Sequence, residues 1–136
     1  MANDSALLDL QGALWANLQA DAALAVDVGD RIYDEVPEDA ARPYVTLGEA
    51  VETPSNDVAA FGSRIAATLH IWSDYGGFAE ALGIARHLVR VLDHQQLLVP
   101  GRALVLAHHE QTITMRDPDP DVRHVAVRFA FETYPT

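Results

Sequence analysis

The chain has 136 residues, no cysteine and a formal charge of −11, and all nine of its basic residues are arginine. The missing cysteines exclude disulfides, thiolate metal sites and thiol catalysis, and the acidic charge disfavours specific binding to a nucleic-acid backbone. The length suits one domain, which we expect to span residues 1–136. No apolar run is long enough to span a membrane and no signal peptide is recognisable, so we expect a soluble protein made in the cytoplasm.

Periodic apolar residues predict a helix at the start of the chain. Asp4 or Ser5 can cap its first turn, because their side-chain oxygens can accept backbone N–H groups. Apolar side chains then recur at helical spacing on one face. These side chains are Leu7, Leu8, Leu14, Trp15 and Leu18. A short turn is predicted over residues 21–26, and Gly29 ends it.

Three strands are predicted next, at residues 31–34, 44–51 and 63–73. The third alternates apolar and polar side chains, and Trp72 lies on its polar face, where we expect it under a helix or at an interface. The loop over residues 52–62 separates the second and third strands. Its segment from Val58 to Phe61 is apolar for a loop, which indicates either a neighbouring subunit or a core contact beneath the loop.

The second helix is predicted over residues 78–93, with an apolar stripe along one side. The members of the stripe are Phe78, Leu82, Ala85, Val89 and Leu92, widened by Ala81, Leu88 and Val91. Strands over residues 102–116 and 122–133 follow, joined by an acidic turn. The last strand has one apolar face, and its other face carries small and charged residues, including Arg128, that suit solvent or a subunit contact.

The predicted order is α–β–β–β–α–β–β. Short connections between neighbouring strands favour antiparallel pairing, and two amphipathic helices can cover one face of the resulting sheet. We therefore expect an α+β fold with a mostly antiparallel sheet of about five strands and two helices packed on one face.

The histidines do not form a predicted metal site. His108 and His109 are adjacent in a strand, so their side chains point to opposite faces. His87 and His94 lie two turns apart on the polar side of the second helix, too far to share one ion. We interpret these histidines as surface or interface residues.

The acidic turn gives only a weak indication of calcium binding. Asp117, Asp119 and Asp121 alternate, but the segment lacks the central glycine and the terminal glutamate of a calcium loop. A solvated turn is the favoured interpretation. We find no complete catalytic motif, so we expect no catalytic residues, no cofactor and no metal, and no enzymatic activity.

Three ordered stretches cover nearly the whole chain and carry a resemblance. The first runs from Leu14–Leu18 through Asp21 and includes Arg31–Asp34 and Pro43–Val45. The second is Leu69–Ser73 with Gly76–Gly77 and the following helix. The third is Arg116–Asp119, which leads into the last strand. In this order they resemble the family of phage tail completion or tail terminator proteins. Pro120 departs from the family, in which glycine is common at this position, and should stiffen the turn.

The resemblance implies a structural virion protein without catalytic residues. Its subunits would form a hexameric ring that caps the head-proximal end of the tail tube, stops tube polymerisation and docks the head connector. The expected partners are other copies of the chain, the tail tube protein and a head–tail connector or stopper protein. DNA would only pass through the bore, and the location would be the neck of a virion tail, in a phage, a prophage particle or a gene transfer agent.

The sequence leaves two alternatives open. The chain could be the head–tail connector or stopper protein itself, or a small metal- or ligand-binding α+β domain. For the ring, which needs contacts between two different patches on neighbouring subunits, the sequence suggests residues on the apolar loop, the third strand, the acidic turn and the last strand. These candidates are Val58, Phe61, Trp72, Arg116, Asp117, Asp119, Asp121 and Arg128.

Overall fold

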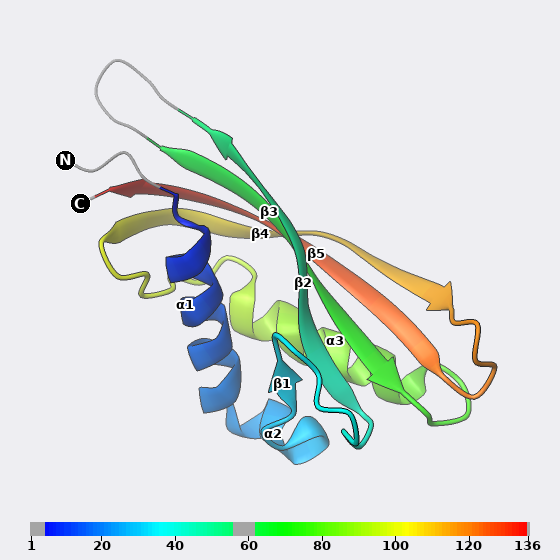
Figure 1. The fold of residues 1–136 in the computed structure, drawn as a ribbon. Coiled ribbons are helices and arrows are strands. Elements are labelled where there is room, and N and C mark those ends of the chain that lie inside the picture. The colour runs from blue at the N-terminus through cyan, green and yellow to red at the C-terminus, as the bar shows by residue number, and fades with distance from the viewer. Residues whose placement is uncertain (1–4, 56–61, 136) are drawn as a thin grey trace.

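The computed structural model describes residues 5–55 and 62–135, and describes residues 104–106 and 135 through their backbone alone (Figure 1). The elements in chain order are α1 (Leu7–Ala20), α2 (Ala22–Val28), β1 (Ile32–Tyr33), β2 (Tyr44–Pro54), β3 (Ser63–Ser73), α3 (Ala79–Leu92), β4 (Arg102–Arg116) and β5 (Arg123–Pro135). The predicted α+β class is confirmed. The predicted order is also found, with one helix added.

The five strands form one sheet in the order β1-β2-β3-β5-β4. The pairs β2–β3, β3–β5 and β4–β5 are antiparallel, whereas the two-residue strand β1 pairs in parallel with β2. The sheet is therefore mixed, although most of its pairing is antiparallel as expected. Strand β4 forms one edge, and at the other edge β1 pairs with β2 only at Val45 and Thr46.

All three helices lie on one face of the twisted sheet, and the other face is open (Figure 1). Alternation places every second residue of β3 and β5 beneath the helices, where the side chains are buried. The largest buried side chains come from both layers, and include Phe129, Phe131, Ile71, Leu69, Ile84, Leu88, Leu10 and Leu18. This single core confirms the face that the alternating pattern predicts for β3 and β5.

The segment predicted as a turn after the first helix is the helix α2. The Asp21 carboxylate accepts the Leu24 N–H at 2.9 Å and so caps the helix, and Gly29 ends it with a φ of 61°. Seven residues are too few to show a clear apolar stripe in the sequence. The expected number of two helices was therefore too low.

The predicted apolar stripe of α1 was only partly right. Leu14 and Leu18 are buried as expected and Leu10 joins them, but Leu8 is 78% exposed and Trp15 is 47% exposed. The Trp15 indole N–H donates to the Ile32 carbonyl at 3.1 Å, which holds the ring at the rim of the core. In α3 the stripe is rotated in the same manner, with Ile84 buried and Leu82 41% exposed.

The loop predicted to begin at Glu52 is shorter than expected. Strand β2 continues to Pro54, which pairs with Ser63 of β3. A bulge between Leu47 and Ala50 shifts the register of this hairpin by one residue, so a simple alternating pattern cannot continue through it. The charged and turn-forming residues near the end of β2 therefore gave a misleading boundary.

Candidate interaction surfaces

The open face of the sheet carries a cluster of stacked rings. Trp72 lies on this face, half-buried, and its register partner in β5 is His124. The two rings stack with centroids 3.8 Å apart and an interplanar angle of 16°. His70, two residues before Trp72 and therefore on the same face, places its Nδ1 2.6 Å from Nε2 of His124.

The bulge in β2 completes this cluster. It brings Glu49 Oε1 to 2.6 Å from Nε2 of His70, and Gly48 lies against the His70 ring. The Trp72 indole N–H donates to Thr46 Oγ1 at 3.3 Å. Each polar group of the cluster therefore has a partner from a neighbouring strand.

The hydrogen bond between His70 and His124 limits the number of protons that the two imidazole rings can carry. Burial lowers the pKa of His124 and His70 acts in the same direction, while Asp117 and Glu49 act in the opposite one. The hydrogen bond from His70 lowers the pKa of Glu49. When both imidazoles are protonated, both facing nitrogens carry hydrogens, so the short N–H···N bond cannot form. The arrangement is stable with at most one imidazolium.

Sequence reasoning singled out Trp72 but missed His70 and His124. The alternation of β3 places His70 and Trp72 on one face, and that signal was visible. The contact with His124 spans 54 residues and depends on the register between β3 and β5, which the sequence does not specify. Within residues 5–55 and 62–135 no group of three histidines or carboxylates is placed to hold a metal ion.

The acidic turn between β4 and β5 bonds to its own backbone. The Asp117 carboxylate accepts the Asp119 N–H, and the Asp119 carboxylate accepts the Asp121 N–H, both at 2.9 Å. Such bonds explain aspartate at alternate positions without an ion. Asp121 is exposed, and Arg116 at the end of β4 is exposed opposite Arg123.

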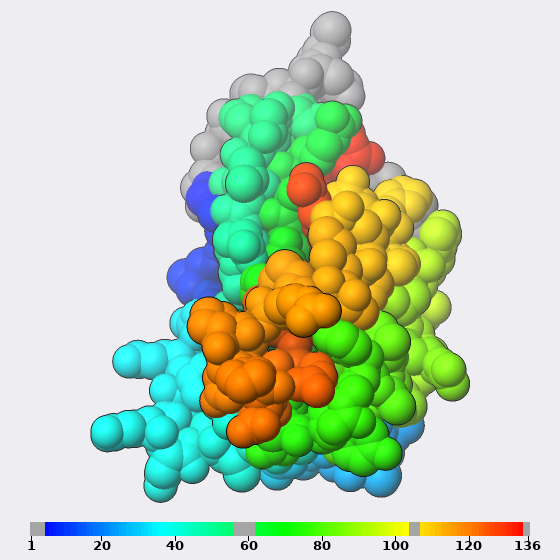
Figure 2. Space-filling model, turned by 90° about the vertical axis from the view of Figure 1, so that its right-hand side faces the viewer, coloured from blue at the N-terminus to red at the C-terminus, as the bar shows by residue number. Residues whose placement is uncertain are grey.

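The structure thus brings four of the expected interface residues together at the turn, and Trp72 lies near them on the open face, stacked on His124, which pairs with Met115 of β4. The turn lies at the right-hand side in Figure 1 and faces the viewer in Figure 2 (orange), where the loop after β1 (cyan) projects to its lower left. Arg128 lies further along the open face, where its Nε is 3.0 Å from Glu110 Oε1. Val58 and Phe61 lie outside the described residues.

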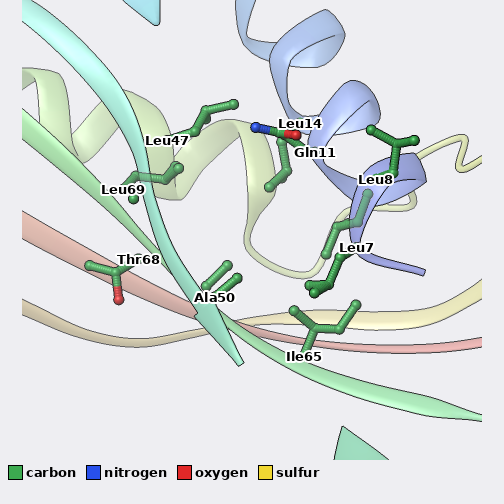
Figure 3. Close-up of a pocket in the computed structure, with 12 residues that line it drawn as sticks. Leu7, Leu8, Gln11, Leu14, Leu47, Ala50, Ile65, Thr68 and Leu69 are labelled. Atoms are coloured by element: carbon green, nitrogen blue, oxygen red, sulfur yellow. The ribbon is translucent and has the colours of Figure 1, made fainter. Parts of the chain in front are cut away.

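A groove that the sequence did not predict opens between α1 and the β2–β3 hairpin (Figure 3). Its volume is about 310 Å³, and apolar side chains form most of its wall. Leu7, Leu8 and Gln11 contribute from α1, and Leu47 and Ala50 contribute from β2. The available signal was the apolar stripe of α1, which includes Leu8 although the core does not bury it.

Comparison with known proteins identifies the family. The model of the family described as "Tail completion protein gp17" matches residues 12–134. A chain in a solved structure titled "Virion of native gene transfer agent (GTA) particle" has a TM-score of 0.90 and 27% sequence identity, covering 96% of this chain and 98% of that chain. No curated protein sequence matches significantly. None of the described helices is long and apolar enough to cross a membrane.

The family match covers almost the whole described fold, from the middle of α1 to the end of β5. The stretches that carried the resemblance lie on consecutive parts of this fold. They include the Trp15 that closes the core at β1, the Trp72 of the open face and the acidic turn. The chain belongs to the family of tail completion proteins, which are structural proteins of phage tails.

Proposed function

We propose that the chain forms a hexameric ring that caps the head-proximal end of the tail tube, terminates tube polymerisation and joins the tail to the head connector. The observation that carries this proposal is the family match over residues 12–134. The similar chain in the gene transfer agent virion supports a place in an assembled particle, because the two chains correspond over nearly their full lengths. The partners would be other copies of the chain, the tail tube protein and the head connector or stopper.

The surface chemistry supports a role in contacts and not in catalysis. The polar groups that could have served a reaction are held by structural partners: His70 lies between His124 and Glu49, and His109 Nε2 is 2.8 Å from Thr112 Oγ1. The aspartates of the β4–β5 turn accept bonds from their own backbone. We therefore propose a structural subunit without enzymatic activity, located at the neck of the particle after assembly in the host cytoplasm.

The acidic charge supports DNA passage through the ring without binding. Each subunit carries a formal charge of −11, which repels the phosphate backbone. A bore lined mainly by basic side chains would contradict this part of the proposal. The relevant side chains are Arg64, Arg116, Arg123 and Arg128.

Removal of the chain tests the proposed function. Particles assembled without it should have tails of abnormal and variable length and should fail to join heads, as measured by electron microscopy. Tails of normal length that lack heads would instead favour a connector or stopper role. Particles with normal tails and attached heads would contradict both roles.

A further inference from the structure

The two edges of the sheet carry grooves with opposite charge. The groove that we call the α1 edge groove lies between α1, β2 and Asp34, the residue that follows β1. The groove that we call the α3 edge groove lies between α3 and β4, at the opposite edge of the sheet. The α1 edge groove consists of Leu8, Gln11, Gly12, Trp15, Asp34 and Leu47. The α3 edge groove consists of Leu82, Ala85, Arg86, Val89, Arg90 and Thr112.

Both grooves expose apolar side chains that a single subunit leaves in water. In the α1 edge groove Leu8 is 78% exposed and Trp15 is 47% exposed, and in the α3 edge groove Leu82 is 41% exposed. The α1 edge groove also adjoins the larger apolar groove, with which it shares Leu8, Gln11 and Leu47. Burial of these side chains against a partner would be favourable because it removes apolar area from water.

The charged residues of the two grooves are complementary. Asp34 is exposed in the α1 edge groove and Arg86 is exposed in the α3 edge groove, and neither has an ion-pair partner within the described part of the chain. Arg90, in contrast, is already paired with Asp21 at 2.6 Å. The α1 edge groove is therefore an apolar surface with an unpaired carboxylate, and the α3 edge groove is an apolar surface with an unpaired guanidinium. The two surfaces are complementary in charge.

The position of the grooves determines the occupant that fits them. Two different, complementary surfaces at opposite edges of one subunit allow each copy to bind the next through the same contact, and such a chain closes into a ring when the rotation permits. We propose that the α1 edge groove of one copy binds the α3 edge groove of the next, with Asp34 facing Arg86. This inference rests on the proposed ring and names the surfaces that build it, in place of the β4–β5 turn.

Cysteine cross-linking tests this contact directly, since the natural chain contains no cysteine. Gly12→Cys places a thiol in the α1 edge groove, where a Cβ meets no atom within 4 Å, and Thr112→Cys places one at an exposed position of the α3 edge groove. A short bismaleimide should link a mixture of the two single variants, in particles and in concentrated protein, whereas neither variant alone should link to itself. Asp119→Cys in the exposed turn, paired with Gly12→Cys, is the matched control and should not link.

The outcomes separate this inference from the proposed function. Efficient linking of Gly12→Cys alone would indicate a two-fold contact and would overturn the inference. A ring at the neck of particles with normal tails, but without links between Gly12→Cys and Thr112→Cys, would overturn the inference and leave the proposed function standing. Normal tails and attached heads in particles that lack the chain would remove the proposed function itself.

Reversing the charges of Asp34 and Arg86 tests the proposed contact in a second way. Asp34→Arg and Arg86→Asp should each weaken the association by roughly tenfold or more, because each places like charges across the contact. The combined variant, with both changes in one chain, should recover most of the association, since every contact again contains one charge of each sign. Failure of the combined variant to recover, while circular dichroism shows native folding of all three variants, would contradict the pairing.

Discussion

The two faces of the sheet are stabilised in different ways. The face beneath the helices is an apolar layer in which alternate residues of β3 and β5 are buried. The open face depends on partner-specific contacts instead, such as the stacking of Trp72 on His124 and the ion pairs Arg64–Glu132 and Arg128–Glu110. The difference indicates that the covered face provides most of the free energy of unfolding. The smaller contribution of the open face depends on local geometry and on the protonation of its histidines.

The largest expected effect comes from the covered face. Phe129 is 1% exposed and contacts the rings of Phe131 and His109, with centroids 6.3 Å and 5.7 Å away. Phe129→Ala should lower the free energy of unfolding by about 3–5 kcal/mol, because it loses buried apolar area and leaves a cavity. Urea denaturation measures this loss. A smaller loss than the open-face variants show would contradict the inference that the covered face provides most of the stability.

On the open face, close packing at the β2 bulge should produce the next largest effect. A Cβ at Gly48 would lie 2.5 Å from His70 Cδ2 and 2.7 Å from the Thr68 carbonyl oxygen. Gly48→Ala should therefore lower the free energy of unfolding by about 1–3 kcal/mol, since the ring and the strand must move apart. Thermal unfolding monitored by circular dichroism provides the measurement.

The control for that variant is Gly83→Ala in α3. A Cβ at Gly83 meets no atom within 4 Å, and alanine favours a helix over glycine. This variant should raise the free energy of unfolding by up to about 1 kcal/mol. Equal and small effects for both glycines would mean that the His70 ring does not lie against the bulge.

The histidine pair should make stability depend on pH. Burial lowers the pKa of His124 in the folded chain below its unfolded value of about 6.5, so the stabilisation is fully present above that pH and is lost as the pH falls through the folded pKa. The natural chain should therefore lose stability over the pH range below about 6.5, and His124→Gln should lose less. Denaturation midpoints across this range measure the effect.

The exposed His108 provides the control for this pH dependence, because its ring contacts His94 and not the cluster. His108→Gln should keep the dependence of the natural chain. The interpretation of the cluster would be wrong if His124→Gln showed the same decline as the natural chain and as His108→Gln.

The smallest effect is expected from the exposed ion pair between Arg64 and Glu132. Its nitrogen and oxygen lie 3.0 Å apart, but the side chains remain 64% and 38% exposed. A double-mutant cycle with Arg64→Ala and Glu132→Ala should give an interaction free energy below about 1 kcal/mol, decreasing with added salt. An interaction as large as that of the Gly48 contact would show that charge pairs contribute more to the open face than we infer.

The periodic parts of the fold could be predicted from the sequence. The alternation in β3 and β5 placed their apolar faces correctly because a one-residue shift would expose the core. The rotation of the α1 stripe was not predictable in the same way, since Leu8 and Trp15 are as apolar as the residues that pack and only the tertiary arrangement leaves them exposed. The helix α2 was missed because its stability depends on the Asp21 cap and its neighbours, including Arg90.

The surfaces were less predictable than the fold. The acidic turn was correctly interpreted as a turn, and its aspartates do bond to their own backbone. The cluster of His70, His124 and Glu49 depends on strand register and on a bulge, neither of which leaves a local signal. The complementary grooves depend on the order of strands in the sheet, because only that order places α1 and β4 at opposite edges.

A reconstruction of the neck of an assembled particle tests the central claim most directly. We expect six copies of this fold in a closed ring between the last tube layer and the head connector, with acidic side chains facing the bore. Density for the chain along the tube, inside the head connector or in a ring of another symmetry would contradict the account.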